Sequence, residues 1–101
     1  MSGYYDLKRS GDQYMFNLRG ENYEPILTSE RYVTKTGALS GIESVRQNSP
    51  IDARYQRKTA SDGSPYFVLV AANGTVIGRS EMYSSTSARE RGIESLISNT
   101  E

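Results

Sequence analysis

The sequence predicts an α+β domain built from a β-β-β-α unit that occurs twice in tandem. Two pairs of short segments support this prediction, because each segment recurs at a displacement of 51 positions. Ser29-Glu30-Arg31-Tyr32 returns as Ser80-Glu81-Met82-Tyr83, and Gly41-Ile42-Glu43-Ser44 returns as Gly92-Ile93-Glu94-Ser95. Around these segments, apolar residues recur at every second position in some stretches and at helical spacing in others. Both strands and helices are therefore expected in each copy.

The first copy begins with a predicted hairpin. Tyr5 and Leu7 alternate with polar neighbours, which is typical of a half-buried strand. The Ser-Gly-Asp sequence at 10–12 favours a turn. Phe16 and Leu18 then continue the same alternation in a second strand.

A third strand is expected before the first helix. Ile26, Thr28, Glu30 and Tyr32 share one parity, and side chains of one parity face the same side of a strand. We therefore expect Glu30, and Glu81 in the second copy, to lean toward the face that the helices cover.

A helix is predicted from Lys35 to about Asn48. Thr34 offers a side-chain oxygen for the N-terminal cap, and Pro50 disfavours helical geometry at the residue before it. The predicted apolar stripe consists of Ala38, Leu39, Ile42 and Val45. Gly41 lies in the middle, where glycine costs roughly 1 kcal/mol relative to alanine. Its recurrence as Gly92 predicts close packing at this point.

The second copy repeats the order of elements. Asn73-Gly74 favours a two-residue hairpin turn in which both residues have positive φ. The expected elements are strands at 55–59, around Phe67 and Leu69, and at 76–81, followed by a helix capped by Ser85 with a stripe of Ala88, Ile93, Leu96 and Ile97.

The length favours one domain that covers residues 1–101. Repeat one occupies about 3–50 and repeat two about 53–101. Each repeat has close to 50 residues, a size at which a separate hydrophobic core is marginal. We therefore expect the two repeats to share a single core.

Composition excludes several classes of function. The chain has no cysteine and no histidine, so thiol chemistry, thiolate metal sites and the commonest general base are excluded. Lys and Arg together number 12, as do Asp and Glu, so no net charge attracts nucleic acid or an anionic membrane. The N-terminal residues lack the pattern of a signal peptide, and no apolar run is long enough to cross a bilayer. A soluble cytoplasmic protein is expected.

The combined motifs resemble the YegP-like family of small tandem-repeat bacterial proteins. The likeness covers nearly the whole chain and includes both repeated segments, the Asp62-Gly63 turn, Tyr66-Phe67-Val68-Leu69 and Ala72-Asn73-Gly74. The resemblance implies one six-stranded antiparallel sheet, with the third strands exchanged between the repeats and both helices on one face. It implies no activity, because the family is functionally uncharacterised.

Glu30, Tyr32, Glu81 and Tyr83 are the first candidate site. They would lie where the repeats meet, and they could form a shared cleft with two acids and two phenols. Alternatively, each glutamate accepts hydrogen bonds from the first turn of the helix that follows it, where the backbone carries partial positive charge.

Paired basic residues give a second candidate. Lys8 and Arg9 correspond in position to Arg57 and Lys58, and tyrosines lie nearby in the sequence. Such a strip could bind single-stranded nucleic acid through phosphate contacts and stacking. Alternatively, these charges solvate the strands and discourage edge pairing. The zero net charge weighs against nucleic-acid binding.

The third candidate is the sheet face opposite the helices. Tyr66, Val68 and Val70 are expected there, and this half of the face would be apolar. An exposed apolar patch could bind a protein partner or a second copy of the chain, so a monomer and a homodimer both stay open. Chain ends or loops could instead cover it.

These observations favour a small non-catalytic binding or protein-interaction module without a cofactor or a metal ion. Weak nucleic-acid binding is the alternative. A carboxylate-based enzyme has little support, because no spacing pairs a base with a nucleophile, and the acidic residues do not follow a metal-binding loop pattern.

Overall fold

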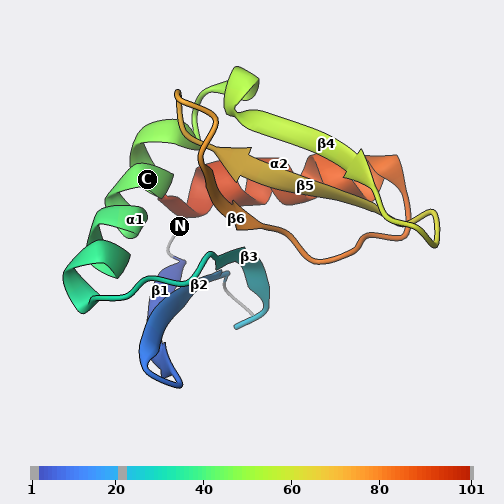
Figure 1. Cartoon of the computed structure of the whole chain (residues 1–101). Helices are drawn as coiled ribbons and strands as arrows, with labels where there is room; N and C mark the ends of the chain where they lie inside the picture. The colour runs from blue at the N-terminus through green and yellow to red at the C-terminus, as the bar shows by residue number, and fades with distance from the viewer. Residues whose placement is uncertain (1–2, 21–22, 101) are drawn as a thin grey trace.

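The computed structural model describes residues 3–20 and 23–100, and it confirms the predicted order of elements in both repeats (Figure 1). The elements are β1 Tyr4–Ser10, β2 Gln13–Arg19, β3 Pro25–Ser29, α1 Lys35–Asn48, a 3-10 turn Asp52–Arg54, β4 Tyr55–Thr59, β5 Pro65–Val70, β6 Val76–Arg79 and α2 Thr86–Thr100. Among the described residues, no helix is long and apolar enough to cross a membrane.

The six strands form one antiparallel sheet in the order β1-β2-β3-β6-β5-β4. Each third strand therefore stays beside the second strand of its own repeat, and the expected exchange of third strands is wrong. The two third strands instead pair with each other at the centre, where Thr28 lies opposite Arg79. These residues are 51 positions apart, so the pseudo-twofold axis passes between them.

Both helices pack on one face of the sheet over a core that the repeats share. In Figure 1, α2 runs behind β5. Each helix contacts strands of both repeats: α1 contacts β2, β5 and β6, whereas α2 contacts β5 and β3. The largest fully buried side chains include Phe16, Leu18, Phe67, Leu69, Leu96 and Val45. Leu39 was expected in the apolar stripe, but it is half exposed, because it lies one residue, or about 100°, beyond the buried Ala38.

A β-bulge occurs at the same place in both third strands. Leu18 pairs with Leu27 while Arg19 pairs with Pro25, which leaves Ile26 as an extra residue. Ile77 is the corresponding extra residue in β6. Ile26 and Leu27 are consecutive, yet both belong to the core. The single parity predicted from Ile26 to Tyr32 is therefore broken at the bulge.

The turn between β5 and β6 also differs from its prediction. It spans 71–75, Gly74 has a φ of +85°, and Asn73 does not have a positive φ. The Gly74 N–H donates to the Ala71 carbonyl (2.9 Å), and Asn73 Oδ1 accepts from the Thr75 N–H (3.0 Å). The loop is longer than a two-residue hairpin, so a single glycine in the left-handed region is enough.

Candidate functional site

The serine of each Ser-Glu-x-Tyr segment holds the end of the third strand against the second strand. Ser29 Oγ accepts from the Phe16 N–H (2.9 Å) and donates to the Glu30 carbonyl (2.7 Å). Ser80 Oγ makes the same two bonds, with the Phe67 N–H (3.0 Å) and the Glu81 carbonyl. Both serines are buried, so each hydroxyl satisfies backbone groups that water does not reach.

The tyrosine of each segment packs against the helix glycine. The Tyr32 and Tyr83 rings stack on Phe16 and Phe67, with both pairs of ring centroids 6.3 Å apart. A Cβ on Gly92 would meet the Tyr83 hydroxyl and would lie 2.5 Å from its Cζ, and Gly41 has the same relation to Tyr32. The close packing predicted from the two helix glycines is therefore present.

Burial controls the chemistry of these two phenols. It raises the pKa of Tyr83 to about 12, and the neighbouring Glu81 charge adds to the shift. The Tyr32 pKa is raised for the same two reasons, first burial and then Glu30. Both phenols are therefore protonated near neutral pH, and neither serves as a general base there.

Glu30 and Glu81 do not cap the helices. Thr34 Oγ1 accepts from the Gly37 N–H (2.9 Å) and Ser85 Oγ accepts from the Ala88 N–H (3.0 Å), so the predicted caps are confirmed. Both glutamates are exposed, and neither carboxylate bonds to a helix N–H in the described part of the chain. Glu81 lines a cleft beside α2, whereas Glu30 is exposed and does not, although both follow a bulge at the same place in the third strand.

One half of the predicted junction site does line a cleft. This junction cleft has a volume of 240 Å³ and lies between the start of β3, the segment after β6 and the first half of α2. Its polar lining includes Glu24, Glu81, Tyr83, Arg91 and Ser95. Glu30 and Tyr32 lie outside it, so the structure does not bring the four predicted residues into one shared cleft.

The cleft lies where the pairing between the repeats stops. On one side of the axis the Glu30 N–H donates to the Ile77 carbonyl (3.1 Å). On the other side, the equivalent bond from Glu81 to Ile26 is absent from the described residues. The chain after β6 therefore lacks this bond to β3 at the place where the junction cleft lies.

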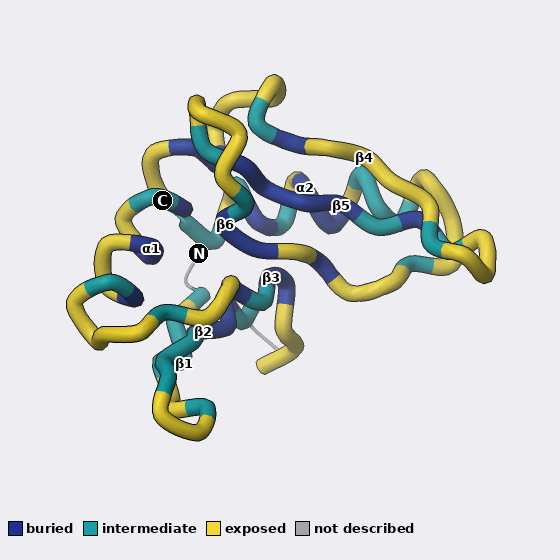
Figure 2. Tube along the Cα trace, viewed as in Figure 1, coloured by how far each residue is buried: buried dark blue, intermediate teal, exposed yellow. Residues whose placement is uncertain are grey.

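The residues of the apolar patch expected on the open face are mostly buried. Val68 and Val70 are 4% and 6% exposed, and only Tyr66 of the three is partly exposed. Figure 2 shows β5 buried along most of its length beside the exposed β4. Val68 lies between Gln56 and Arg79 on the flanking strands, and both of these residues have side chains long enough to cover it.

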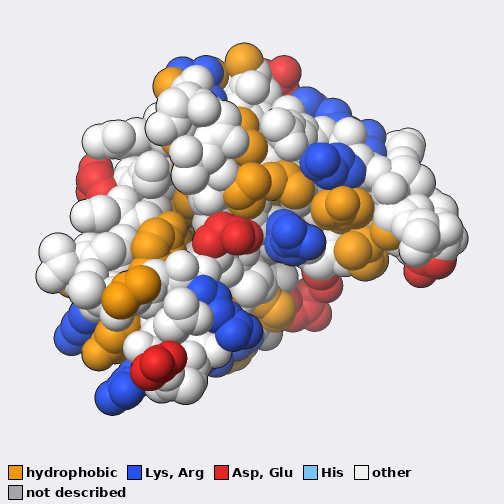
Figure 3. All heavy atoms as spheres, in the orientation of Figure 1, with side chains coloured by type: hydrophobic (Ala, Val, Ile, Leu, Met, Phe, Trp, Pro, Cys, Tyr) orange, Lys and Arg blue, Asp and Glu red, His pale blue; other side chains and the backbone are white. Residues whose placement is uncertain are grey.

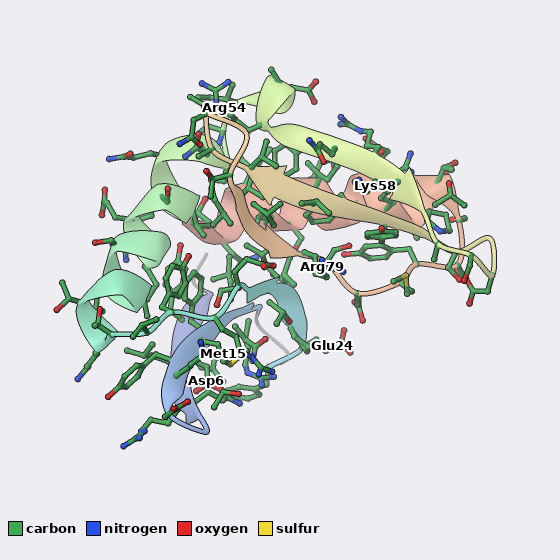
Figure 4. The ribbon with its side chains drawn as sticks, viewed as in Figure 1. Asp6, Met15, Glu24, Arg54, Lys58 and Arg79 are labelled. Carbon is green, nitrogen blue, oxygen red and sulfur yellow. The ribbon has the colours of Figure 1, made fainter. Side chains whose placement is uncertain are left out.

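The two basic pairs lie far apart. They belong to β1 and β4, which are the opposite edges of the sheet and therefore roughly 24 Å apart at ordinary strand spacing. Figure 4 shows Lys58 and Asp6 at these opposite sides, with Arg79 between them. In Figure 3, acidic and apolar side chains separate the basic groups on this face. The structure does not join the pairs into one strip.

In each basic pair, one residue is paired with acidic side chains. Arg57 bonds to Glu90 and Asp52, each at 3.0 Å, and these contacts raise the pKa of the guanidinium. The Arg57 hydrogen bond is also the main reason why the pKa of Glu90 is lowered. Lys8 lies 3.3 Å from Asp6. Lys8 and Arg9 also line a shallow 310 Å³ pocket with Tyr14 and Lys35.

Comparison with known proteins gives a family for this fold. The model of a family described as "Domain of unknown function (DUF1508)" matches twice, at residues 10–56 and 60–101. The chain belongs to this DUF1508 family. A UPF0339 protein of Bordetella pertussis is 65% identical, over 98% of this chain and 89% of that protein. The UPF0339 protein YegP of Escherichia coli K12 is 51% identical, over 98% and 91% respectively.

Solved structures of other DUF1508 relatives have the same fold. The solution structure of a UPF0339 protein from Shewanella oneidensis matches with a TM-score of 0.92 at 53% identity, and covers 99% of this chain and 86% of that one. The solution structure of Escherichia coli YegP, described as a protein of unknown function, matches with a TM-score of 0.93 at 50% identity. That match covers 99% of this chain and 87% of YegP. The two family matches agree with the tandem repeat.

Two charged residues that line the junction cleft of this DUF1508 protein were not identified by the sequence analysis. Glu24 precedes β3, and Arg91 lies next to Gly92 on α2. Their equivalents in the other repeat are Thr75 and Ser40, which carry no charge. This difference between the repeats is a signal that could have identified them.

Proposed function

We propose that this protein is a non-catalytic interaction module of the cytoplasm that binds a short segment of a protein partner in the junction cleft. The observation that carries the proposal is the missing backbone bond between Glu81 and Ile26 at the place where the cleft lies. The sheet could continue there as it does at Glu30, so the opening is not a requirement of the fold.

The lining of the cleft supports a partner that carries charges of both signs. Glu24 and Glu81 suit a cationic side chain, Arg91 suits a carboxylate, and Tyr83 and Ser95 add hydroxyl groups. These side chains are partly or fully exposed, so each ion pair adds little on its own and binding is weakened by salt.

The absence of catalysis is part of the same proposal. It is supported by the lack of histidine and cysteine in the sequence and by the raised pKa of Tyr83 in the cleft. No specific observation favours nucleic-acid binding over this proposal, because the two basic pairs lie at opposite edges of the sheet.

Amide chemical shifts of the ¹⁵N-labelled protein test the proposal. The probes are two tripeptides with blocked ends, Lys-Gly-Glu and Gly-Gly-Gly, each at about 10 mM, where a site with a Kd of about 1 mM is mostly occupied. We expect Lys-Gly-Glu to shift the signals of Glu81, Tyr83 and Arg91, and Gly-Gly-Gly to leave them unchanged. Glu81→Gln and Arg91→Gln should each weaken the effect, and Glu30→Gln is the matched control.

Either of two results would overturn the proposal. One is the absence of any shift in the cleft with Lys-Gly-Glu. The other is an equal response in the Glu81→Gln and Glu30→Gln variants, which would show that the peptide does not use the cleft.

A further inference from the structure

A second cavity lies at the other end of the shared core, away from the junction cleft. It is an open hollow with a volume of 490 Å³, lined by the last turns of α1, the 3-10 turn before β4 and the β5–β6 turn. Figure 4 shows Arg54 beside that turn. The cavity therefore lies between elements of both repeats, and its arginine belongs to neither basic pair considered above.

Arg54 is held in place by a buried side chain. Its Nε donates to Asn48 Oδ1 (3.0 Å), and Asn48 Nδ2 donates to the Ser44 carbonyl (2.9 Å). Asn48 is only 8% exposed. This chain of hydrogen bonds fixes the guanidinium group and uses one of its five N–H groups, so the four N–H groups on its two Nη atoms are left for other acceptors.

Among the residues that the structure describes, no acidic side chain pairs with those N–H groups. Arg54 forms no ion pair within residues 3–20 and 23–100, whereas the nearby Arg57 is paired with two acids. The cavity lining contains no Asp or Glu. A positioned arginine without an acidic partner is suited to an external anion.

The other polar groups of the cavity can also donate. Asn73 Oδ1 is already used by the Thr75 N–H, so its Nδ2 is the end left for a ligand. Ser44 and Gln47 supply a hydroxyl and an amide from α1. Ile51, which is 39% exposed, adds apolar surface to the wall. The cavity thus offers several donors and one apolar wall.

Comparison of the repeats shows that the arginine is not needed to complete the fold. Asn99 corresponds to Asn48, and its Nδ2 makes the same bond, to the Ser95 carbonyl (2.8 Å). Its Oδ1 is buried and has no partner among the described residues. Tyr5 pairs with Leu18 as Tyr55 pairs with Leu69, so Tyr5 and Tyr55 are equivalent. The residue before each of them is therefore also equivalent, and Tyr4 corresponds to Arg54. Of the two equivalent asparagines, Asn48 of the first repeat bonds to a guanidinium group, whereas Asn99 of the second repeat has no such bond among the described residues.

We propose that this cavity binds a small organic oxyanion, either a carboxylate or a phosphate. The two Nη atoms of Arg54 would donate to two oxygens of the anion, with Asn73 and Ser44 donating from the sides. The apolar part of the ligand would lie against Ile51. The proposal of an anion site does not rest on the function proposed for the junction cleft.

Titrations followed by amide chemical shifts test the site on the full-length chain. The probes are inorganic phosphate and sodium propionate, each compared with sodium chloride at equal ionic strength. We expect one or both probes to cause saturable shifts at Asn48, Arg54 and Asn73. A response to phosphate alone identifies a phosphate ligand, and a response to propionate alone identifies a carboxylate.

Two variants distinguish recognition by the planar guanidinium group of Arg54 from attraction by its positive charge alone. Arg54→Gln should abolish the saturable shifts, and Arg54→Lys should weaken binding at least about tenfold, because an ammonium group keeps the charge but loses the planar fork. Arg79→Gln removes an exposed arginine elsewhere and should leave the affinity unchanged. The spectrum of each free variant reports whether it is folded.

The proposal fails if neither probe produces shifts beyond those of sodium chloride. It also fails if folded Arg54→Gln binds the probe as well as the unaltered chain does.

Discussion

Ser29 and Ser80 show how a repeated residue can be explained by hydrogen bonding alone. Each hydroxyl accepts from a buried backbone N–H of the second strand and donates to the carbonyl of the following glutamate. We predict that Ser80→Ala destabilises the protein by about 1–3 kcal/mol, because the Phe67 N–H is left buried without a partner. Urea denaturation measures the loss. Ser61→Ala, at an exposed turn position, is the control, and equal stabilities for the two variants would contradict the prediction.

At the scale of single elements, the helix glycines and the segment tyrosines form one packing unit in each repeat. The Tyr83 ring fills the space that a side chain at position 92 would occupy. We predict that Gly92→Ala destabilises the protein by about 1–3 kcal/mol, since Tyr83 must leave its stack on Phe67 and the strain outweighs the roughly 1 kcal/mol gained in helix propensity. Thermal unfolding measures the change.

A double-mutant cycle identifies the cause of that loss. In a Tyr83→Leu background the ring is absent, so Gly92→Ala should cost clearly less than it does in the unaltered chain. Ser87→Ala, at an exposed position of α2, controls for helix propensity and should be neutral or slightly stabilising. An equal cost of Gly92→Ala in both backgrounds would show that Tyr83 is not responsible.

The elements themselves were largely predictable, because local chemistry determines them. Thr34 and Pro50 correctly indicated the two ends of α1, and Ser85 correctly indicated the start of α2. The bulges were not predictable, since Ile26 and Leu27 are both apolar and their sequence does not indicate which one is the extra residue. The single parity expected from Ile26 to Tyr32 was wrong for this reason.

The candidate sites were predicted less well than the elements, because they depend on strand order and register. Glu81 and Tyr83 line the junction cleft, but Glu24 reaches it from a loop 57 positions away in sequence. Val68 is buried between Gln56 and Arg79, which become its neighbours only in the assembled sheet.

At the scale of the whole molecule, the two repeats complete each other. Thr28 and Arg79 meet at the pseudo-twofold axis, and Ser49 and Thr100, also 51 positions apart, share a hydrogen bond of 2.8 Å between their hydroxyls. Each helix contacts strands of both repeats. The duplication therefore produces a single interior to which both repeats contribute.

The shared interior predicts that neither repeat folds alone. A peptide of residues 1–50 would expose the face of α1 that contacts β5 and β6, and a peptide of 51–101 would expose the face of α2 that contacts β3. Chains of about 50 residues without disulfides or metals are near the lower limit for a stable core. We expect each peptide to lack a cooperative thermal transition by circular dichroism, whereas the full chain unfolds in one transition. An equimolar mixture of the peptides tests whether the missing contacts can be restored between molecules. A cooperative transition in either isolated peptide would show that its repeat has a sufficient core of its own, and that the contacts across the axis join two independent units.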